Sequence, residues 1–306
     1  MRITVAGHLC LDIIPNWQRG TLAALRPGNL VHMDGVTFST GGAVANTGIA
    51  LKRLGFDPIL IGRMGDDPVS EISRSILRRE NISPDYIALS PGETSSYTVV
   101  LNPPDTDRIF LHYPGTNDSF SVKDIDFGTI PPGIFHFGYP PLMRQMYVEQ
   151  GTHLENLFRE AKAHGLITSL DMALPDPNSE QGQVDWKAIL QRVLPYVDLF
   201  LPSLDELLLM MDSSAYNRMQ RGLLPIDTRL LDDLSTRFLT WGGNVVGIKL
   251  GEEGFYLRTG SKAGNTFGEK WRARQILAPI FKVQVQGTTG AGDTTIAGFL
   301  VISFNT

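Results

Sequence analysis

Hydrophobic positions along the chain recur with two different periods, and each period predicts one kind of element. Short apolar runs at residues 3–6, 58–62 and 86–89 are typical of buried strands. Residues 66–80 instead place apolar side chains three and four positions apart, which predicts an amphipathic helix. The first third of the chain therefore predicts strands separated by helices.

This alternation becomes regular from residue 133 onward. Short connections between successive strands and helices favour a mostly parallel sheet that is covered on both faces. The predicted strands are 134–137, 166–171, 197–201, 244–250 and 254–257, and the predicted helices are 152–164, 184–194 and 228–241. We therefore expect an α/β fold with a single domain over residues 1–306.

One segment departs from the alternation and predicts a β-hairpin. Residues 94–102 and 108–113 alternate apolar and polar side chains around a turn rich in proline and aspartate. Together with an irregular segment that includes a predicted strand at 31–38, they indicate a small sheet built from about residues 13–38 and 94–116. Arg108 could reach a substrate from this sheet, although an exposed arginine on an edge strand is the commoner explanation.

Composition and charge narrow the classes of function. The chain is 42% hydrophobic and 19% charged, and its net charge of −5 argues against a nucleic-acid-binding surface. Cys10 is the only cysteine, which excludes an internal disulfide and fits a cytoplasmic protein. No apolar run approaches the length of a membrane span, and the N-terminus predicts a strand rather than a secretion signal.

The segment QGTTGAGD at residues 286–293 is the strongest candidate for chemistry. Its glycines let the backbone approach a ligand closely, and the N–H groups that open the following helix favour an anion. A carboxylate at this place, Asp293, suits the acceptance of a proton from a hydroxyl that attacks a phosphoryl group. A tight turn in which Asp293 caps the helix is the alternative for this motif taken alone.

Two further segments offer groups that could bind hydroxyls. The motif GGAVAN at residues 41–46 opens a helix with small side chains, and Asn46 carries both a donor and an acceptor. Asp12 follows the first strand, where ligands bind in open α/β sheets. Tight packing of the helix and capping of local backbone by Asp12 are the alternatives. The chain has neither the three-glycine dinucleotide fingerprint nor a Walker-type loop.

Taken together, these motifs resemble those of the PfkB, or ribokinase-like, family of carbohydrate kinases. GGAVAN at 41–46 and TTGAGD at 288–293 carry the resemblance, which covers essentially the whole chain. Weaker supports follow in family order: Asp12, GTN at 115–117, SLDE at 203–206 and KLGEEG at 249–254. The resemblance implies a three-layer α/β/α sandwich with a small β-sheet lid that closes over the sugar, and a homodimer that pairs through the lid.

The resemblance also implies an activity, which is ATP-dependent and Mg²⁺-dependent phosphorylation of a hydroxyl. The acceptor would be a fructose-like, ribose-like or 2-keto-3-deoxygluconate-like sugar, or a nucleoside. Asp293 would be the catalytic base, beside an anion hole formed by the N–H groups of Gly290, Ala291 and Gly292. The sugar would be held by Asp12, Gly41, Gly42 and Asn46. The nucleotide side would comprise Ser203, Glu206, Lys249, Gly251, Gly254 and Thr288, with Glu206 positioning Mg²⁺ through water.

Three departures from the family pattern qualify these expectations. Gly287 stands where the family usually has an aspartate that helps bind a monovalent cation, so activation by K⁺ is not expected. Ser203 replaces the usual asparagine near Mg²⁺. The sequence ends 13 residues after Asp293, whereas family members continue with helices that wall the adenine pocket. A catalytically weak protein that binds sugar or nucleotide is therefore the alternative to an active kinase.

Overall fold

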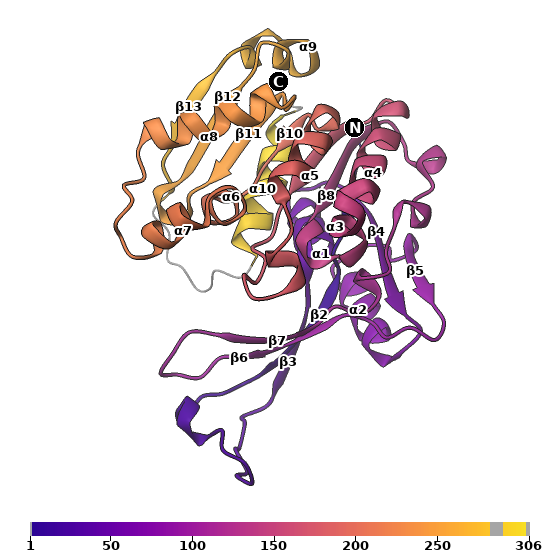
Figure 1. Cartoon of the computed structure of the whole chain (residues 1–306). Coiled ribbons are helices and arrows are strands. Elements are labelled where there is room, and N and C mark those ends of the chain that lie inside the picture. The colour runs from indigo at the N-terminus through magenta and orange to yellow at the C-terminus, as the bar shows by residue number, and fades with distance from the viewer. Residues whose placement is uncertain (1, 282–289, 304–306) are drawn as a thin grey trace.

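The structure is a computed structural model that describes residues 2–281 and 290–303, and it contains two β-sheets of unequal size (Figure 1). Over these residues, the strands of the larger sheet are, in sheet order, β13 (Gln275–Ala278), β12 (Phe255–Thr259), β11 (Val245–Lys249), β10 (Leu199–Phe200), β9 (Ile167–Asp171), β8 (Gly133–Gly138), β1 (Arg2–Gly7), β4 (Ile59–Gly65) and β5 (Ile87–Ser90). All pairs from β5 to β11 are parallel, and β12 and β13 add an antiparallel edge. The predicted, mostly parallel sheet is confirmed.

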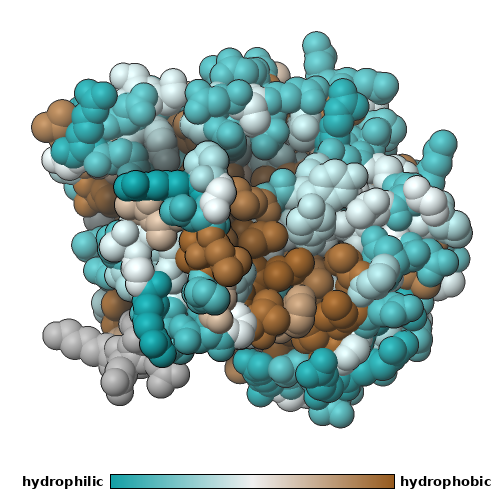
Figure 2. Space-filling model, turned by 90° about the horizontal axis from the view of Figure 1, so that it is seen from below, coloured by the Kyte–Doolittle hydropathy of each residue, from teal (hydrophilic) through white to brown (hydrophobic). Residues whose placement is uncertain are grey.

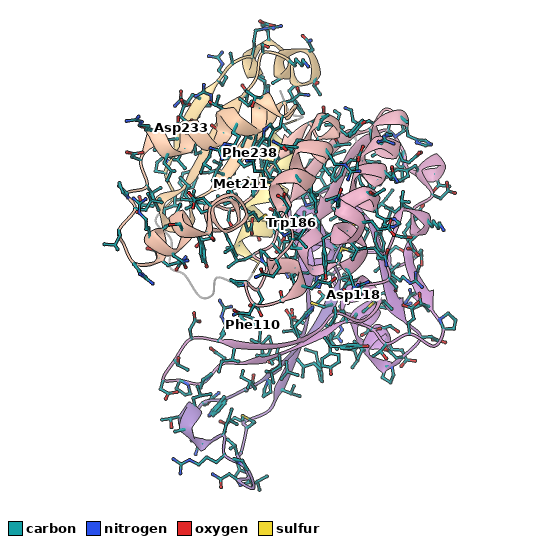
Figure 3. The ribbon with its side chains drawn as sticks, in the orientation of Figure 1. Phe110, Asp118, Trp186, Met211, Asp233 and Phe238 are labelled. Carbon is teal, nitrogen blue, oxygen red and sulfur yellow. The ribbon has the colours of Figure 1, made fainter. Side chains whose placement is uncertain are left out.

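Helices cover both faces of this sheet, as predicted. The helices of one layer are α3 (Arg144–Tyr147), α4 (Thr152–Ala163), α5 (Trp186–Val193), α6 (Leu204–Met211), α7 (Ser213–Gln220) and α8 (Thr228–Thr240). The helices of the other layer are α1 (Gly42–Arg53), α2 (Pro68–Arg79), α9 (Ala263–Phe267) and α10 (Ala291–Ile302). Trp186 and Phe238 belong to the first layer (Figure 3). The fold is a three-layer α/β/α sandwich.

Local periodicity accounts for both the strands and the helices of this sandwich. Along β8, Ile134 packs into one core cluster and Phe135 into the other, because successive side chains of a strand point to opposite faces. In α4, Leu154, Leu157 and Phe158 are fully buried, and their spacing places them on one helix face. Burial of each such side chain contributes about 1.5–3 kcal/mol to stability.

The smaller sheet has the strand order β3 (Val36–Gly41), β2 (Cys10–Pro15), β6 (Tyr97–Leu101) and β7 (Ile109–Tyr113). The predicted hairpin is present as the antiparallel pair β6–β7. The sequence did not predict β2 as a strand, although it pairs with both β3 and β6. The strand expected at 31–38 lies instead at 36–41, because its pairing with β2 continues as far as Gly41.

The smaller sheet projects away from the sandwich and is exposed along much of its length (Figure 1). Phe110 on β7, labelled in Figure 3, is 55% exposed, and Val36 and Phe38 on β3 are also exposed. Figure 2 shows hydrophobic side chains gathered on the face of the molecule that is seen from below, toward which this sheet projects.

The chain crosses between the two sheets at places that are hydrogen-bonded to one another. Asn117 follows β7, and its side chain accepts from Leu9 N (3.1 Å) and donates to Leu9 O (3.0 Å), between β1 and β2. Val44 N in turn donates to His8 O (3.1 Å), which links the start of α1 to the same crossing. The smaller sheet is thus attached to the larger one through a compact junction.

Smaller differences from the predicted elements have local causes. The strand predicted at 197–201 is reduced to Leu199–Phe200, although Leu201 N still donates to Leu170 O just beyond its end. The helix predicted at 184–194 begins at Trp186, after Asp185, whose side chain caps it. None of the helices described here has the length and apolar character that crossing a bilayer requires.

Candidate active site

Asp293 lies in the first turn of α10, directly after Gly290, whose φ of 74° is left-handed. Glycine adopts this conformation without a Cβ clash, so the turn can present the helix N-terminus to a ligand. The Asp293 side chain is buried, and its Oδ2 accepts hydrogen bonds from Asn46 Nδ2 (3.0 Å) and the Tyr139 hydroxyl (2.8 Å). Its Oδ1 is buried and has no hydrogen-bond partner among the described residues. Two hydrogen bonds therefore hold Oδ2 in place, while Oδ1 can still accept a hydrogen bond.

The surroundings of Asp293 make its carboxylate more basic than a free one. Burial raises the pKa of Asp293, and the hydrogen bonds from Asn46 and Tyr139 and the charge of Lys249 oppose that rise. Burial and the nearby Asp293 charge raise the pKa of Tyr139 well above its ordinary value, so its hydroxyl stays protonated and donates. A carboxylate with a raised pKa is suited to accept a proton near neutral pH.

The motif at residues 41–46 reaches this carboxylate from the start of α1, which packs against α10. Gly42 is left-handed (φ 83°), and a Cβ there would lie 2.5 Å from His8 O. A side chain at this position would therefore displace the junction between the sheets. Asn46 lies one turn further along and contacts Asp293 directly. The structure thus brings together the two glycine motifs, which are far apart in the sequence.

Asp12 lies on β2, on the other side of this motif. A Cβ on Gly41 would lie 2.6 Å from both carboxylate oxygens of Asp12, so glycine is needed for this close approach. Burial raises the pKa of Asp12 to about 6. A chain of contacts runs from Thr98 Oγ1 to Cys10 Sγ (3.9 Å) and from Cys10 Sγ to Asp12 Oδ1 (3.6 Å).

A buried ion pair lies where β9 and β11 end. Lys249 Nζ is 2.6 Å from Asp171 Oδ1, and Asp171 Oδ2 has no hydrogen-bond partner among the described residues. Burial lowers the pKa of Lys249, but the charges of Asp171 and Glu206 outweigh it and the pKa is raised, so the ammonium stays charged. A Cβ on Gly292 would lie 3.5 Å from Lys249 Nζ. A positive charge therefore lies against the first turn of α10.

Ser203 and Glu206 form a capping box at the start of α6. Ser203 Oγ accepts from Glu206 N (3.3 Å), and Glu206 Oε2 accepts from Ser203 N (2.7 Å). Glu206 is 8% exposed, and its charge raises the pKa of both Asp171 and Asp293. Ser203 also pairs with Lys249 through an isolated β-bridge. Both residues therefore lie beside the ion pair.

The other candidate residues on the nucleotide side are only partly described. Gly251 and Gly254 both have positive φ, 58° and 104°, in the turn that joins β11 to β12. A Cβ on Gly254 would lie 2.1 Å from Ala278 O, so this glycine is required by the edge of the sheet. Thr288 and Gly287 lie outside the described residues.

Arg108 lies in the hairpin of the smaller sheet. Its guanidinium is 5.7 Å from the centre of the Phe110 ring, and its Nε is 3.8 Å from Asp107 Oδ1. These two contacts do not connect it to Asp12 or Asp293.

Sequence reasoning missed three residues of this region. Tyr139 follows β8 with a left-handed backbone (φ 69°), a conformation that the local sequence does not indicate. His8 and His112 lie with their ring centres 5.4 Å apart, and His8 is 6.1 Å from the ring of Tyr139. The position of His8 directly after the first strand was the available signal, because the ends of such strands carry ligands in α/β folds.

The donor set around Asp171 and Asp293 fits Mg²⁺ that is held mainly by water and phosphate. Over residues 2–281 and 290–303, no group of three His, Cys, Asp or Glu side chains is arranged to bind a metal directly. The unpartnered Asp171 Oδ2, with Glu206 nearby, is an oxygen acceptor of the kind that Mg²⁺ and its water shell prefer.

Comparison with known proteins identifies the family. The family model described as pfkB family carbohydrate kinase matches residues 2–302. The chain belongs to the pfkB family of carbohydrate kinases. The conclusion holds over nearly the whole sequence, including both glycine motifs and both sheets.

Individual members of this family have low sequence identity to this chain. A fructokinase from Vibrio alginolyticus is 26% identical over 302 residues, which cover 98% of this pfkB family member and 83% of that protein. A ribokinase from Staphylococcus aureus is 24% identical over 277 residues, covering 90% and 78%. The solved structure of Arabidopsis thaliana ribokinase, complexed with ribose and ATP, has a TM-score of 0.71 at 18% identity and covers 99% of this chain and 86% of that one. At that identity the structural match establishes the ribokinase-like fold.

Proposed function

We propose that this protein transfers the γ-phosphoryl group of ATP to a hydroxyl of a small sugar, with Asp293 as the base. The observation that carries the proposal is the state of the Asp293 carboxylate: Oδ2 is held by Asn46 and Tyr139, while the buried Oδ1 has no partner among the described residues. The names of the relatives, fructokinase and ribokinase, support a sugar as the acceptor.

The acceptor hydroxyl would lie against Asp293 Oδ1, which takes its proton as the oxygen attacks the γ-phosphorus. The N–H groups of Gly290, Ala291 and Gly292 would stabilise the charge on the transferring group, because the first N–H groups of a helix lack intrahelical partners. Lys249, held by Asp171, adds a positive charge beside the same turn. Phosphoryl transfer needs this kind of positioning and charge stabilisation more than covalent help.

The remaining hydroxyls of the sugar would bind Asp12 and the backbone of Gly41 and Gly42. The close approach of the Asp12 carboxylate to Gly41 supports this role, since it places an acceptor next to the start of α1. Arg108 would reach the acceptor from the hairpin of the smaller sheet. We propose that the smaller sheet acts as a lid that excludes water from the acceptor.

The nucleotide would extend from the first turn of α10 toward the turn that joins β11 to β12. Mg²⁺, when bound with ATP, would neutralise the phosphates, and Glu206 would hold one of its waters. Ser203 fixes Glu206 through the capping box and Gly251 and Gly254 shape the turn. The proposed homodimer would pair through the smaller sheet, whose exposed Val36, Phe38 and Phe110 support such a contact.

The test is the variant Asp293→Asn, assayed for ATP consumption with a panel of sugars and nucleosides. The amide cannot accept the proton, so we expect kcat to fall by roughly 10²–10⁴-fold, while stabilisation by sugar and an ATP analogue persists. Asp233→Asn is the control, because Asp233 is an exposed aspartate on α8 (Figure 3) and its loss should leave kcat unchanged.

Two results would contradict the proposal. Wild-type kcat in Asp293→Asn would remove Asp293 from the chemistry. Stabilisation of the wild-type protein by sugar and ATP analogue without any turnover would instead identify a binding protein that retains the site without the reaction.

A further inference from the structure

His8 is a buried histidine whose hydrogen-bonding capacity is unused. The residue is 2% exposed, and neither Nδ1 nor Nε2 has a hydrogen-bond partner among the described residues. Most buried polar side-chain atoms in proteins have at least one partner, so two unpartnered nitrogens on one ring call for an explanation. The mechanism proposed above does not use this ring.

The position of His8 supplies that explanation. On one side its ring lies 6.1 Å from the ring of Tyr139, whose hydroxyl donates to Asp293. On the other side it lies 5.4 Å from the ring of His112. His112 Nδ1 is 2.9 Å from Thr98 Oγ1, from which the contacts through Cys10 lead to Asp12.

His8 therefore packs against Tyr139, which holds the proposed base, and against His112, from which contacts lead to the proposed sugar-binding carboxylate. Its Nδ1 abuts Gly42, since a Cβ there would lie 2.6 Å from this nitrogen. His8 follows β1 of the larger sheet, whereas His112 belongs to β7 of the smaller sheet. The two rings thus meet at the boundary between the sheets, where movement of the smaller sheet would open space for an acceptor.

We propose that His8 is an acceptor-binding residue and that one of its ring nitrogens binds a hydroxyl of the substrate. This inference rests on the proposed kinase function and names a further contact to the acceptor in the same site.

The charge state of the ring agrees with this assignment. Burial and the neighbouring His112 lower the pKa of His8 to about 3, so the ring is neutral at pH near 7. A neutral imidazole offers one N–H donor and one acceptor, and a hydroxyl group can pair with either of them.

The test compares acceptors and variants. Wild-type protein is assayed with ATP and D-fructose, D-ribose, adenosine or 2-keto-3-deoxygluconate, and the best acceptor is then used with His8→Phe. Phenylalanine keeps an aromatic ring of similar size but lacks both nitrogens. We expect KM for the acceptor to rise by about tenfold or more, with kcat and KM for ATP changed by less than about threefold, because a site built to bind a hydroxyl loses that contact alone.

A matched substitution and a second variant keep the result interpretable. His153→Phe, on α4, should leave every constant unchanged, because the ring of His153 lies beside the exposed carboxylate of Glu149 (3.9 Å) rather than in the site. His8→Asn retains one donor and one acceptor and should recover part of the affinity for the acceptor, and it serves if His8→Phe does not fold. Melting temperatures of both variants report any loss of folding.

The outcomes separate this inference from the function on which it rests. An unchanged KM for the acceptor in His8→Phe would overturn the inference while the kinase assignment stands. An equal loss of kcat with all acceptors, together with a lower melting temperature, would show a structural role and would also overturn it. Absence of turnover with any acceptor in wild-type protein would contradict the proposed function itself.

Discussion

The two sheets of this molecule have different surroundings and carry different parts of the site. The larger sheet is enclosed by helices, and strands such as β8 are buried along most of their length. The smaller sheet leaves β7 and the start of β3 exposed. The larger sheet and α10 position Asp293, Tyr139 and the Lys249–Asp171 pair. The smaller sheet contributes Asp12, and with it the contacts that lead to His112.

This difference suggests that the two sheets have different roles in the proposed reaction. The groups that we propose act in phosphoryl transfer lie on the larger sheet and α10, which helices enclose. Asp12, which we propose binds the acceptor, lies on the smaller sheet, which has fewer packing contacts. Substitutions in the larger sheet should therefore affect stability and kcat, and substitutions in the smaller sheet should affect mainly the binding of the acceptor.

The largest expected contrast is in stability, between Phe137→Ala on β8 and Phe110→Ala on β7. Phe137 is fully buried and packs against Phe158 and Phe120, so its loss should lower the free energy of unfolding by about 3–5 kcal/mol. Phe110 is 55% exposed, and its loss should cost less than about 0.5 kcal/mol. Chemical denaturation of both variants measures the difference.

The same pair of variants tests the proposed homodimer. If Phe110 is buried between two copies, the effect of Phe110→Ala should grow with protein concentration, because association stabilises the folded state. Equal losses of unfolding free energy in Phe137→Ala and Phe110→Ala at all protein concentrations would contradict the contrast between the sheets.

An intermediate effect is expected for Tyr139→Phe, which removes one donor from Asp293. We expect kcat to fall about tenfold, since the carboxylate is less well held. The Tyr139 hydrogen bond lowers the pKa of Asp293, so its loss raises that pKa and the base stays protonated up to a higher pH. The acidic limb of the kcat/KM profile should therefore move to higher pH. Tyr147→Phe, which alters a tyrosine packed against Trp186, should leave the profile unchanged; an unmoved limb in Tyr139→Phe would contradict this role.

The smallest effect is expected for Asp12→Asn in the unliganded protein. The folded protein holds the Asp12 proton up to a pKa of about 6, above the ordinary value of 3.8, so ionisation lowers stability as the pH rises between these values. Asp12→Asn has no carboxyl group at this position, so its stability lacks this dependence on pH. Relative to wild type, its melting temperature should rise by on the order of 2 °C between about pH 4 and about pH 7. A constant difference between the two proteins would show that Asp12 has an ordinary pKa.

The larger sheet could be predicted because its signals are local. Apolar runs and helical spacing lie within single segments, and the alternation of these segments favours a parallel sheet. β2 was missed because Asp12 interrupts its apolar pattern and because its strand character depends on pairing with β3, some thirty residues away in the sequence. Pairing partners of this kind are set by the tertiary structure rather than by the residues of the strand itself.

Prediction of the site from the sequence meets the same limit, because some of its residues are brought together only by the tertiary structure. Asp293 and Asn46 could be proposed because glycine-rich turns mark places where the backbone approaches a ligand. The hydrogen bond from Tyr139 could not, because it depends on a left-handed backbone that follows the tight passage of Gly138, where a Cβ would lie 2.2 Å from that of Ala43. The proposed role of His8 could not be predicted either, because it depends on the rings of His112 and Tyr139, which the fold places beside it.

The two hydrogen bonds between Asn117 and Leu9 have a mechanical consequence. They tie the chain that leaves the smaller sheet to the chain that enters it, close to the start of α1. If the smaller sheet moves as the proposed lid, these bonds would let it pivot about the junction, whereas sliding across the sandwich would break them. Closure about the junction would bring Asp12 and His112 back to the same place relative to Asp293.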